Sequence, residues 1–354
     1  MSLENEQHLA AYDYSLDPSL IAASPAAERD QSRLLVYHRK REKIEHRRFS
    51  SLPEYLHPSD LLVLNDTRVF PARLRAKKKS GGRIELLLLR PSVSDRDVWE
   101  VMMTGKVTPP VDLLLEEGAI AHVVREIDGG HKEIRFELPK GTPDLNAYLE
   151  RWGEVPLPPY IVKKRAGRSD TADRERYQTV YAKASGSAAA PTAGLHFTDA
   201  LLEEIRRKEI QIATVTLHVG LGTFQPMREE RIADHRMHRE WFQIPLETAE
   251  AVKGARRSGG RVIAVGTTAT RALESASRPD GTVQSGAGET ELFITPGYHF
   301  KAVDGLITNF HLPKSTLLVL VSAFAGGEAV RAVYQEAIRE RYRFYSYGDA
   351  TLIL

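Results

Sequence analysis

The chain has 354 residues, of which 42% are hydrophobic and 27% charged, and its formal net charge is +2. This composition is typical of a globular protein with room for two domains rather than one. The sequence contains no cysteine, which excludes disulfides, thiolate metal sites and a cysteine nucleophile and suits a reducing cytoplasm. The N-terminal segment is polar and acidic, and the longest apolar run (317–325) is short. We therefore expect neither a signal peptide nor a transmembrane helix, and a cytoplasmic location.

Short β-rich runs dominate the region from residue 61 to residue 138. They are separated by turn signals such as Ser80-Gly81-Gly82 and Asp128-Gly129-Gly130, and no helical pattern lies between them. The runs are LLVLN, RVFPARLRA, RIELLLLR, VWEVMMTG, AIAHVVREI and HKEIRFEL. Closely spaced strands of this kind predict an antiparallel sheet or a small closed barrel.

The pattern changes to mixed helix and strand after Pro139. Helices are expected over 144–152, 198–208, 246–258, 315–325 and 327–341, and strands over 210–219, 241–244, 261–265, 305–309 and 350–354. The first sixty residues resemble this part more than the β-rich part. The expected fold class is therefore α/β (α+β): a larger mixed domain formed by residues 1–62 and 150–354, with a small antiparallel β-barrel-like domain (63–149) inserted into it.

The densest group of polar and titratable residues lies between Thr216 and Glu240. A predicted strand ends near His218 and is followed by Gly220, Gly222 and Thr223, and the segment continues with Asp234, His235 and His238. A packed core has little use for so many proton-handling groups, so the pattern favours a site. The alternative is a solvated loop with incidental histidines.

Three further segments lie at junctions where α/β proteins form ligand crevices. A run of small residues (188–198) ends at His196 before a predicted helix N-cap at Thr198. Gly266, Thr267, Thr268 and Arg271 follow a predicted strand. Asn309, His311, Lys314 and Ser315 stand between another predicted strand and an apolar helix. A tight packing corner is the alternative interpretation of the first segment.

Many sequence blocks, all in one order along the chain, match the pattern of a known family. They are LLVLNDTRVFPARL (61–74), LPPYI (157–161), YQTVYA (177–182), AAPTAGLHFT (189–198), TLHVGLGTFQP (216–226), DHRMHRE (234–240), GGRVIAVGTTATRALES (259–275), ITPGY (294–298), VDGLITNFHLPKSTLLVLVSAFAG (303–326) and YRFYSYGDATLI (342–353). With these blocks the sequence resembles the S-adenosylmethionine:tRNA ribosyltransferase-isomerase family of queuosine biosynthesis along almost its whole length. One stretch (102–118) departs from the family pattern, which usually has a more basic turn there.

The resemblance implies a transferase that moves and isomerises the ribosyl moiety of S-adenosylmethionine. The acceptor is 7-aminomethyl-7-deazaguanine at the tRNA wobble position, and the products are epoxyqueuosine, adenine and methionine. S-adenosylmethionine is then a consumed substrate and no cofactor or metal is expected. The resemblance also implies an α/β domain with an inserted β-barrel-like domain, and we expect a monomer without membrane contact.

This chemistry needs a base for a ribose C5′ hydrogen, an acid for departing adenine and a neutral acceptor amine. Imidazoles suit such proton transfers because their ordinary pKa lies near working pH. The candidates inside the matching blocks are His196, His218, His235, His238 and His311, with Asp234 as a partner carboxylate. Histidines outside the blocks, such as His8 and His131, are discounted. The expected ligand-binding residues are Gly220, Gly222, Thr223, Gly266, Thr267, Thr268, Arg271, Asn309, Lys314 and Ser315.

Positive charge is gathered in three runs, 38–48, 73–83 and 163–176, each with six Lys or Arg. Such runs are often only solvated surface, but three of them in a nearly neutral chain favour basic patches on one face that contact phosphates. The expected tRNA contacts are Arg73, Arg75, Lys77, Lys78, Lys79, Arg83, Lys163, Lys164 and Arg165.

Two other classes of function remain as alternatives. A metal-dependent hydrolase could use His218, Asp234, His235 and His238 as ligands, although the chain has no HExxH or comparable spacing. A non-catalytic RNA-binding module would bind tRNA through the basic β-rich part and never release adenine.

Overall fold

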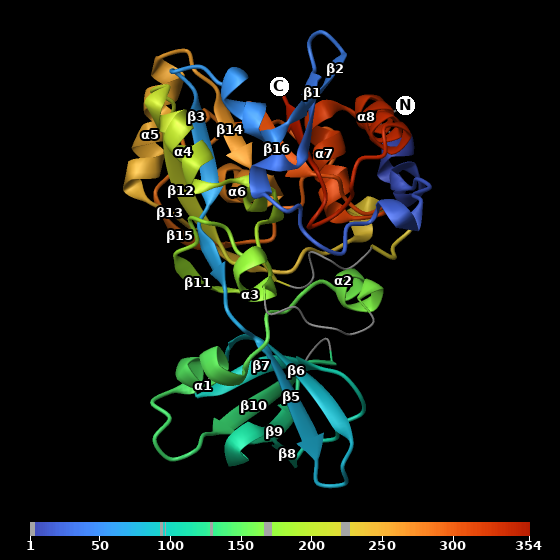
Figure 1. Cartoon of the computed structure of the whole chain (residues 1–354), viewed down its shortest axis with the longest axis vertical. Helices are drawn as coiled ribbons and strands as arrows, with labels where there is room; N and C mark the ends of the chain where they lie inside the picture. The colour runs from blue at the N-terminus through green and yellow to red at the C-terminus, as the bar shows by residue number, and fades with distance from the viewer. Residues whose placement is uncertain (1–3, 93–94, 96, 128–129, 166–171, 221–226) are drawn as a thin grey trace.

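The computed structural model describes residues 4–92, 95, 97–127, 130–165, 172–220 and 227–354. The molecule is elongated, with a mixed α/β part at one end and a closed β-barrel at the other, joined by a narrow neck (Figure 1). This arrangement confirms the expected fold class, a mixed α/β protein that carries a small antiparallel barrel.

Nine strands form the sheet of the α/β part in the order β15-β13-β12-β3-β14-β16-β17-β1-β2. Their bounds are β1 Arg33–His38, β2 Lys43–Arg48, β3 Leu61–Asn65, β12 Gln211–Leu217, β13 Glu240–Ile244, β14 Val262–Val265, β15 Gly286–Thr290, β16 Gly305–Asn309 and β17 Ala350–Ile353. The central strands β12, β3, β14 and β16 are parallel. Their carboxyl ends therefore meet at one edge of the sheet, which is where α/β proteins place ligand sites.

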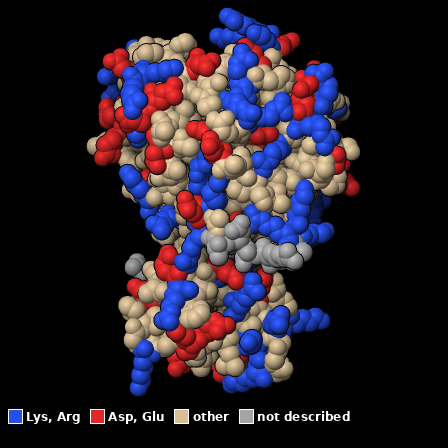
Figure 2. Space-filling view, viewed as in Figure 1, with Lys and Arg blue, Asp and Glu red and all other residues tan. Residues whose placement is uncertain are grey.

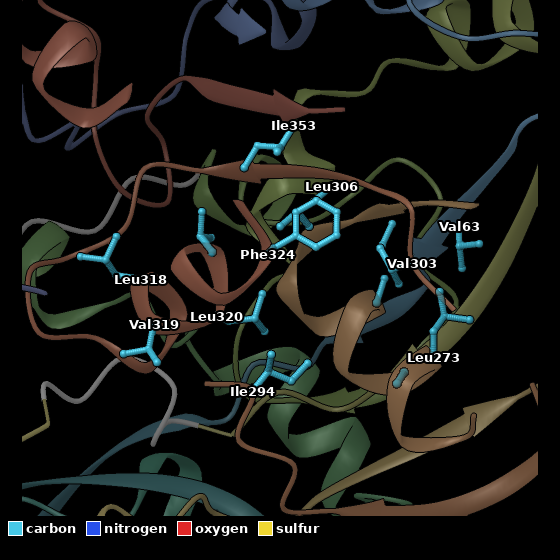
Figure 3. Packing of buried hydrophobic residues seen from close by; sticks show 14 of the residues in the cluster. Val63, Leu273, Ile294, Val303, Leu306, Leu318, Val319, Leu320, Phe324 and Ile353 are labelled. Carbon is cyan, nitrogen blue, oxygen red and sulfur yellow. The ribbon is translucent and has the colours of Figure 1, made fainter. Parts of the chain in front are cut away.

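Helices cover both faces of this sheet. Residues of β3 alternate between two cores: Leu61 and Val63 pack with α5–α8, and Leu62 and Leu64 pack with α4. The first of these cores is shown in Figure 3. The helices are α4 Asp199–Arg207, α5 Leu246–Arg257, α6 Gly266–Ser275, α7 Thr316–Ala325 and α8 Gly327–Arg339. Burial on both faces explains why the parallel strands are almost continuously apolar.

The helix ends follow the capping signals in the sequence. Side chains of Thr198 and Ser315 accept hydrogen bonds from the backbone N–H groups of Leu201 and Leu318, and so cap α4 and α7. Gly326, with a φ of +92°, separates α7 from α8. Among the described residues no single helix is long and apolar enough to cross a membrane; only α7 and α8 together reach that length and hydropathy, and they are bent by 113°.

Six antiparallel strands close the barrel in the order β10-β7-β6-β5-β8-β9. They are β5 Arg73–Lys78, β6 Arg83–Pro91, β7 Val98–Met103, β8 Val111–Leu114, β9 Ile120–Glu126 and β10 Lys132–Glu137. Alternate residues such as Leu74, Ala76 and Leu86 fill the interior. Tyr148 and Leu149 of α1 (Leu145–Trp152) pack on the same core. The small closed barrel expected from the β-rich runs is confirmed.

One of those β-rich runs belongs elsewhere. The run at 61–65 was grouped with the β-rich runs, and the inserted module was expected from residue 63, but the whole run forms β3, which pairs with β12 and β14 in the large sheet. Its five residues are all buried, as in a central parallel strand and unlike the alternating pattern of a barrel strand. Residue 63 thus lies in the large sheet, and the barrel strands begin at Arg73; the division into domains itself stays a prediction.

The neck consists of chain segments that connect the two parts. Strands β4 (Thr67–Val69) and β11 (Ala184–Ser187) pair in parallel, and a bridge joins Arg73 to Glu154. Helices α2 (Pro159–Lys164) and α3 (Asp173–Arg176) lie beside them (Figure 1). Short 3₁₀ helices complete the description: η1 Asn5–Gln7, η2 Leu9–Tyr12, η3 Pro18–Leu20, η4 Arg29–Gln31, η5 Phe49–Glu54, η6 Glu116–Gly118, η8 Thr192–His196 and η10 Ile232–Asp234.

Candidate active site

A cavity of about 650 Å³ lies where the barrel faces the α/β part. This volume is in the range of cavities that bind small molecules and cofactors. The barrel contributes Arg90, Trp99, Glu100 and His131, and the α/β part contributes Gly186, His218, Gly220, His238, Glu240 and Trp241. The cavity therefore has two walls, one from each part of the fold, and both walls carry imidazoles.

His218 directly follows β12 at the carboxyl edge of the sheet. Its ring stacks on Trp241 with centroids 4.9 Å apart, and its Nδ1 lies 2.8 Å from Oγ1 of Thr67. The other side of the ring requires glycine at 186, because a Cβ there would come within 2.6 Å of Nε2. Burial lowers the pKa of His218, with Asp66 opposing the shift. The imidazole is thus held neutral in a fixed orientation, as a proton acceptor requires.

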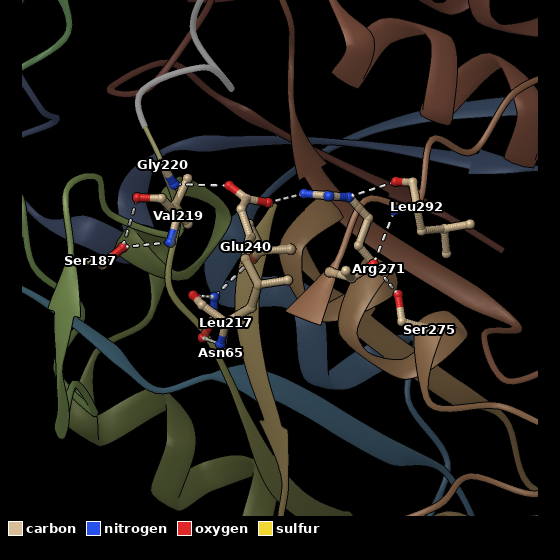
Figure 4. Close-up of polar contacts among 11 residues, drawn as sticks. Asn65, Ser187, Leu217, Val219, Gly220, Glu240, Arg271, Ser275 and Leu292 are labelled. Atoms are coloured by element: carbon tan, nitrogen blue, oxygen red, sulfur yellow. Dashed lines mark hydrogen bonds and ion pairs between the residues drawn. The ribbon is translucent and has the colours of Figure 1, made fainter. Parts of the chain in front are cut away.

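Glu240 connects the cavity wall to a buried arginine (Figure 4). Its Oε1 accepts a hydrogen bond from the backbone N–H of Gly220 at 2.9 Å, and its Oε2 accepts one from Nη1 of Arg271. Nε of Arg271 donates to the carbonyl of Leu292 at 3.0 Å, while its buried Nη2 has no hydrogen-bond partner among the described residues. Arg271 therefore fixes Glu240, which positions Gly220 at the cavity. Gly222 and Thr223 lie outside the described residues.

The Asp234-His235-x-x-His238 segment does not act as one group in the structure. Only His238 lines the cavity. Nδ1 of His235 lies 3.0 Å from Oε2 of Glu229, and its ring packs edge-on against Phe293. Asp234 ends the short helix η10 with its side chain exposed. The extended backbone after η10 separates the two imidazoles that the sequence brings close together.

His196 is buried in the α/β part, away from the residues that line the cavity. Its Nδ1 lies 2.7 Å from Oγ of Ser32, and its Nε2 accepts a hydrogen bond from Nδ2 of Asn309 at 3.2 Å. The imidazole ring stacks on Phe49. Burial, with help from Arg343 and Arg29, lowers its pKa to about 3. Both ring nitrogens have partners, so the contacts of His196 and Asn309 tie η8 to β16.

His311, Lys314 and Ser315 also have partners within the α/β part. Nε2 of His311 lies 2.8 Å from Oγ1 of Thr308, and burial lowers the pKa of His311 to about 3. Nζ of Lys314 lies 2.7 Å from Asp13, and Ser315 caps α7. None of the three is among the residues that line the cavity.

Gly266, Thr267 and Thr268 form the beginning of α6 and do not line the cavity. Nδ2 of Asn65, at the end of β3, donates to Oγ1 of Thr268 at 3.1 Å and to the carbonyl of Leu217 at 3.0 Å. Gly266 has a φ of +90°, and a Cβ at this position would lie 3.6 Å from Cβ of Ala193. Asn65 thus ties β3, β12 and α6 together. The cavity, however, opens at the β12–β13 side of this edge.

The basic side chains differ in how they are held. Arg75 makes two hydrogen bonds to Glu154 (2.7 and 3.2 Å), Lys79 pairs with Asp112, and Arg73 donates to the carbonyl of Leu157. Arg165 forms an ion pair with Asp173 that is largely buried, and Lys78 and Lys164 donate to backbone carbonyls. Lys77, Arg83 and Lys163 are exposed, with no side-chain partner in the described ranges.

The three basic runs lie apart along the length of the molecule and do not form one continuous patch. The run 38–48 forms the β1–β2 hairpin at the end of the molecule opposite the barrel (Figures 1 and 2). Residues 73–83 belong to β5 and β6 of the barrel, and the run from 163 begins in α2 at the neck. A charged run stays at the surface wherever its strand is placed, so charge alone did not predict which runs are neighbours.

Several cavity residues were missed by sequence reasoning. Glu240 closed the candidate segment 216–240 but was given no role, and Trp241 was expected only as the start of a strand. Arg90, Trp99 and Glu100 were expected only as parts of barrel strands, and His131 was discounted because it lies outside the matching blocks, although it lines the cavity. No spacing rule marks them, because they come together only when the barrel meets the large sheet. Over the described part of the chain, no group of three or more His, Asp or Glu side chains has a metal-binding arrangement, so the hydrolase alternative gains no support.

Comparison with known proteins identifies the family. The family model described as "Queuosine biosynthesis protein" matches residues 9–353. A protein of Geobacter sulfurreducens named S-adenosylmethionine:tRNA ribosyltransferase-isomerase is 51% identical over 97% of this chain and 98% of its own length. A protein of the same name from Moorella thermoacetica is 50% identical, with 97% and 98% covered.

A solved structure agrees with the architecture. The crystal structure titled S-adenosylmethionine tRNA ribosyltransferase from Thermotoga maritima is 37% identical, with a TM-score of 0.55, and the match covers 97% of this chain and 100% of that one. The chain is therefore an enzyme of the queuosine biosynthesis protein family.

Proposed function

We propose that this chain transfers and isomerises the ribosyl moiety of S-adenosylmethionine onto 7-aminomethyl-7-deazaguanine at the tRNA wobble position. Epoxyqueuosine in the tRNA, adenine and methionine are the products. The observation that carries the proposal is the match at about half identity, over almost the whole chain, to relatives named S-adenosylmethionine:tRNA ribosyltransferase-isomerase.

The chemistry of the cavity supports the proposal. The positive sulfur of S-adenosylmethionine acidifies the C5′ hydrogens, so a neutral imidazole can remove one of them. The candidates for this base are His218, which burial keeps neutral, and His238, which lines the same wall. Trp241 is 37% exposed beside His218, so one face of its ring can stack on a purine-like base. The Glu240–Arg271 pair then acts on Gly220 as a positioning group.

The tRNA is the second substrate in this proposal. Its anticodon base would enter between the barrel and the α/β part, while the exposed cations Lys77, Arg83 and Lys163 contact phosphates. S-adenosylmethionine is consumed in each turnover, and no further cofactor takes part. The enzyme acts as a monomer in the cytoplasm.

Incubation of the protein with S-adenosylmethionine and tRNA that carries the aminomethyl-deazaguanine base tests the proposal. Mass spectrometry of the digested nucleosides should show epoxyqueuosine, and free adenine should appear in equal amount. Binding of tRNA without release of adenine would favour the RNA-binding module. Release of adenine that does not require the modified base would favour a hydrolase.

A further inference from the structure

The barrel wall of the cavity carries a histidine–carboxylate pair of its own. Nδ1 of His131, just before β10, lies 2.7 Å from Oε1 of Glu100 on β7. Nε of Arg90 on β6 donates to Oε2 of the same carboxylate at 2.8 Å. All three residues line the cavity, and the side chains of His131 and Glu100 are only 22% and 15% exposed. The neighbouring strands β6, β7 and β10 thus bring the side chains of Arg90, Glu100 and His131 together.

The groups around Glu100 determine whether its carboxyl is ionised, and this decides which ring nitrogen of His131 carries the hydrogen. Burial raises the pKa of Glu100, but hydrogen bonds from His131 and Arg90 outweigh burial and leave the pKa below its ordinary value. An ionised Glu100 accepts, so Nδ1 of His131 donates. In the neutral imidazole, Nε2 of His131 is then the atom with the lone pair, and no described residue is hydrogen-bonded to it. This is the arrangement in which a carboxylate orients an imidazole as a base.

The other charged groups near this pair are accounted for. Glu133 on β10 lies opposite Glu100 and is held by Arg125 at 2.6 Å. Across the cavity, the titratable and charged residues of the α/β wall are His218, His238, Arg239, Glu240 and Glu289. Glu240 already accepts from Arg271 and Gly220, and the exposed Arg239 pairs with Glu291. Among the described residues of the barrel wall, His131 is therefore the imidazole with one ring nitrogen that has no hydrogen-bond partner.

We propose that His131 is a catalytic base for the tRNA substrate, and that Glu100 and Arg90 position it. This inference rests on the proposed function and assigns the modified base to the barrel wall. An aliphatic amine is mostly an ammonium ion at neutral pH and cannot attack. Nε2 of His131 takes one proton from the –CH₂–NH₃⁺ group, so the N–H bonding pair remains on nitrogen as the attacking lone pair. The imidazolium is stabilised by Glu100 and later releases its proton to water.

The barrel offers a matched control for this proposal. His122 on β9 also pairs with carboxylates, Asp112 at 2.9 Å and Glu137 at 3.1 Å, but it does not line the cavity. We would compare wild type, His131→Asn, Glu100→Gln and His122→Asn. For each, kcat/KM for the modified tRNA is measured from pH 6.5 to 9.5, together with the Kd for S-adenosylmethionine and the thermal unfolding curve.

His131→Asn should lower kcat/KM at pH 7 on the order of a hundredfold. Its rate should then rise about tenfold per pH unit towards pH 9, because only the amine that is already neutral can react. Glu100→Gln keeps the shape of the site and should lower kcat with little change in KM. His122→Asn should behave as wild type, and all variants should bind S-adenosylmethionine normally.

A pH profile of His131→Asn that runs parallel to wild type would overturn the inference, as would loss of S-adenosylmethionine binding in this variant. If His131→Asn does not fold, the kcat effect of Glu100→Gln decides, and unchanged kcat there overturns the inference. These failures are distinct from failure of the proposed function, in which wild type itself forms no epoxyqueuosine.

Discussion

Arg271 and Glu240 form an ion pair whose side chains are only 4% and 3% exposed. Arg271 belongs to α6 and Glu240 to β13, and Glu240 also accepts the N–H of Gly220 at the cavity. A core helix is therefore coupled through one carboxylate to the backbone of the candidate site. Breaking a buried pair leaves a charge without compensation, which costs far more than losing an exposed pair.

Glu240→Ala should therefore lower the free energy of unfolding by about 3–5 kcal/mol. Glu289→Ala, on the neighbouring strand β15 with a side chain 53% exposed, is the matched control and should change stability by about 0.5 kcal/mol or less. Chemical denaturation measures both. Equal losses in the two variants would show that the buried pair has no special role.

His238 and His235 should differ when each is replaced by Asn. His238 lines the cavity, whereas His235 is held by Glu229 and Phe293. His238→Asn should reduce turnover on the order of a hundredfold, with stability within about 1 kcal/mol of wild type. His235→Asn should have a much smaller effect on turnover. If His235→Asn is the more damaging variant, proton transfer runs through the Glu229 side of the segment instead.

Stability should fall as the pH drops below 6.5. Burial lowers the pKa of His196 and His311 from 6.5 to about 3. Between these values the unfolded chain binds a proton at each histidine and the folded chain does not, so each contributes a loss of about 1.4 kcal/mol per pH unit. Denaturation curves at pH 7, 6 and 5 measure the slope. His311→Gln should reduce the slope by the contribution of one histidine, about 1.4 kcal/mol per pH unit. An unchanged slope in His311→Gln contradicts this account.

The salt dependence of tRNA binding should identify the phosphate contacts. Lys77 and Arg83 stand opposite each other on β5 and β6 and are exposed. Replacing both with Ala should weaken binding for any tRNA sequence and reduce the slope of log K against log salt by about one unit for each lost contact. The matched control replaces Arg206 and Arg207, exposed on α4 of the α/β part. A change in slope in the control alone would indicate that the RNA binds at the other end of the molecule.

Turnover should not require a metal ion. The chain has no cysteine, and the described residues present no arrangement of three or more metal ligands. Activity should persist in EDTA once the tRNA is kept folded by monovalent salt. Activity that disappears in EDTA and returns with one particular divalent ion would contradict this expectation and revive the hydrolase chemistry.

Local patterns in the sequence predicted the elements well. The segments expected as helices at 144–152, 198–208 and 246–258 form α1, α4 and α5 within a residue or two at each end, because capping residues and apolar periodicity act locally. The strand β8 was not expected, since Val111–Leu114 is short and follows a proline-rich turn. The 61–65 run was grouped with the β-rich runs although it pairs in the large sheet, because an apolar run shows that a strand is buried without showing which strands it pairs with.

The sequence by itself determined the fold class and the family, and it supplied a group of candidate histidines. It did so through block order, residue type and periodicity, which are properties of the chain alone. Only the tertiary structure decided that His218 and His238 reach the cavity while His196 and His311 are buried with hydrogen-bond partners. It also brought Glu100 and His131 of the barrel to face them. The physical reason is that burial and long-range contact depend on how sheet and barrel pack together, and residues far apart in the sequence carry no local sign of that packing.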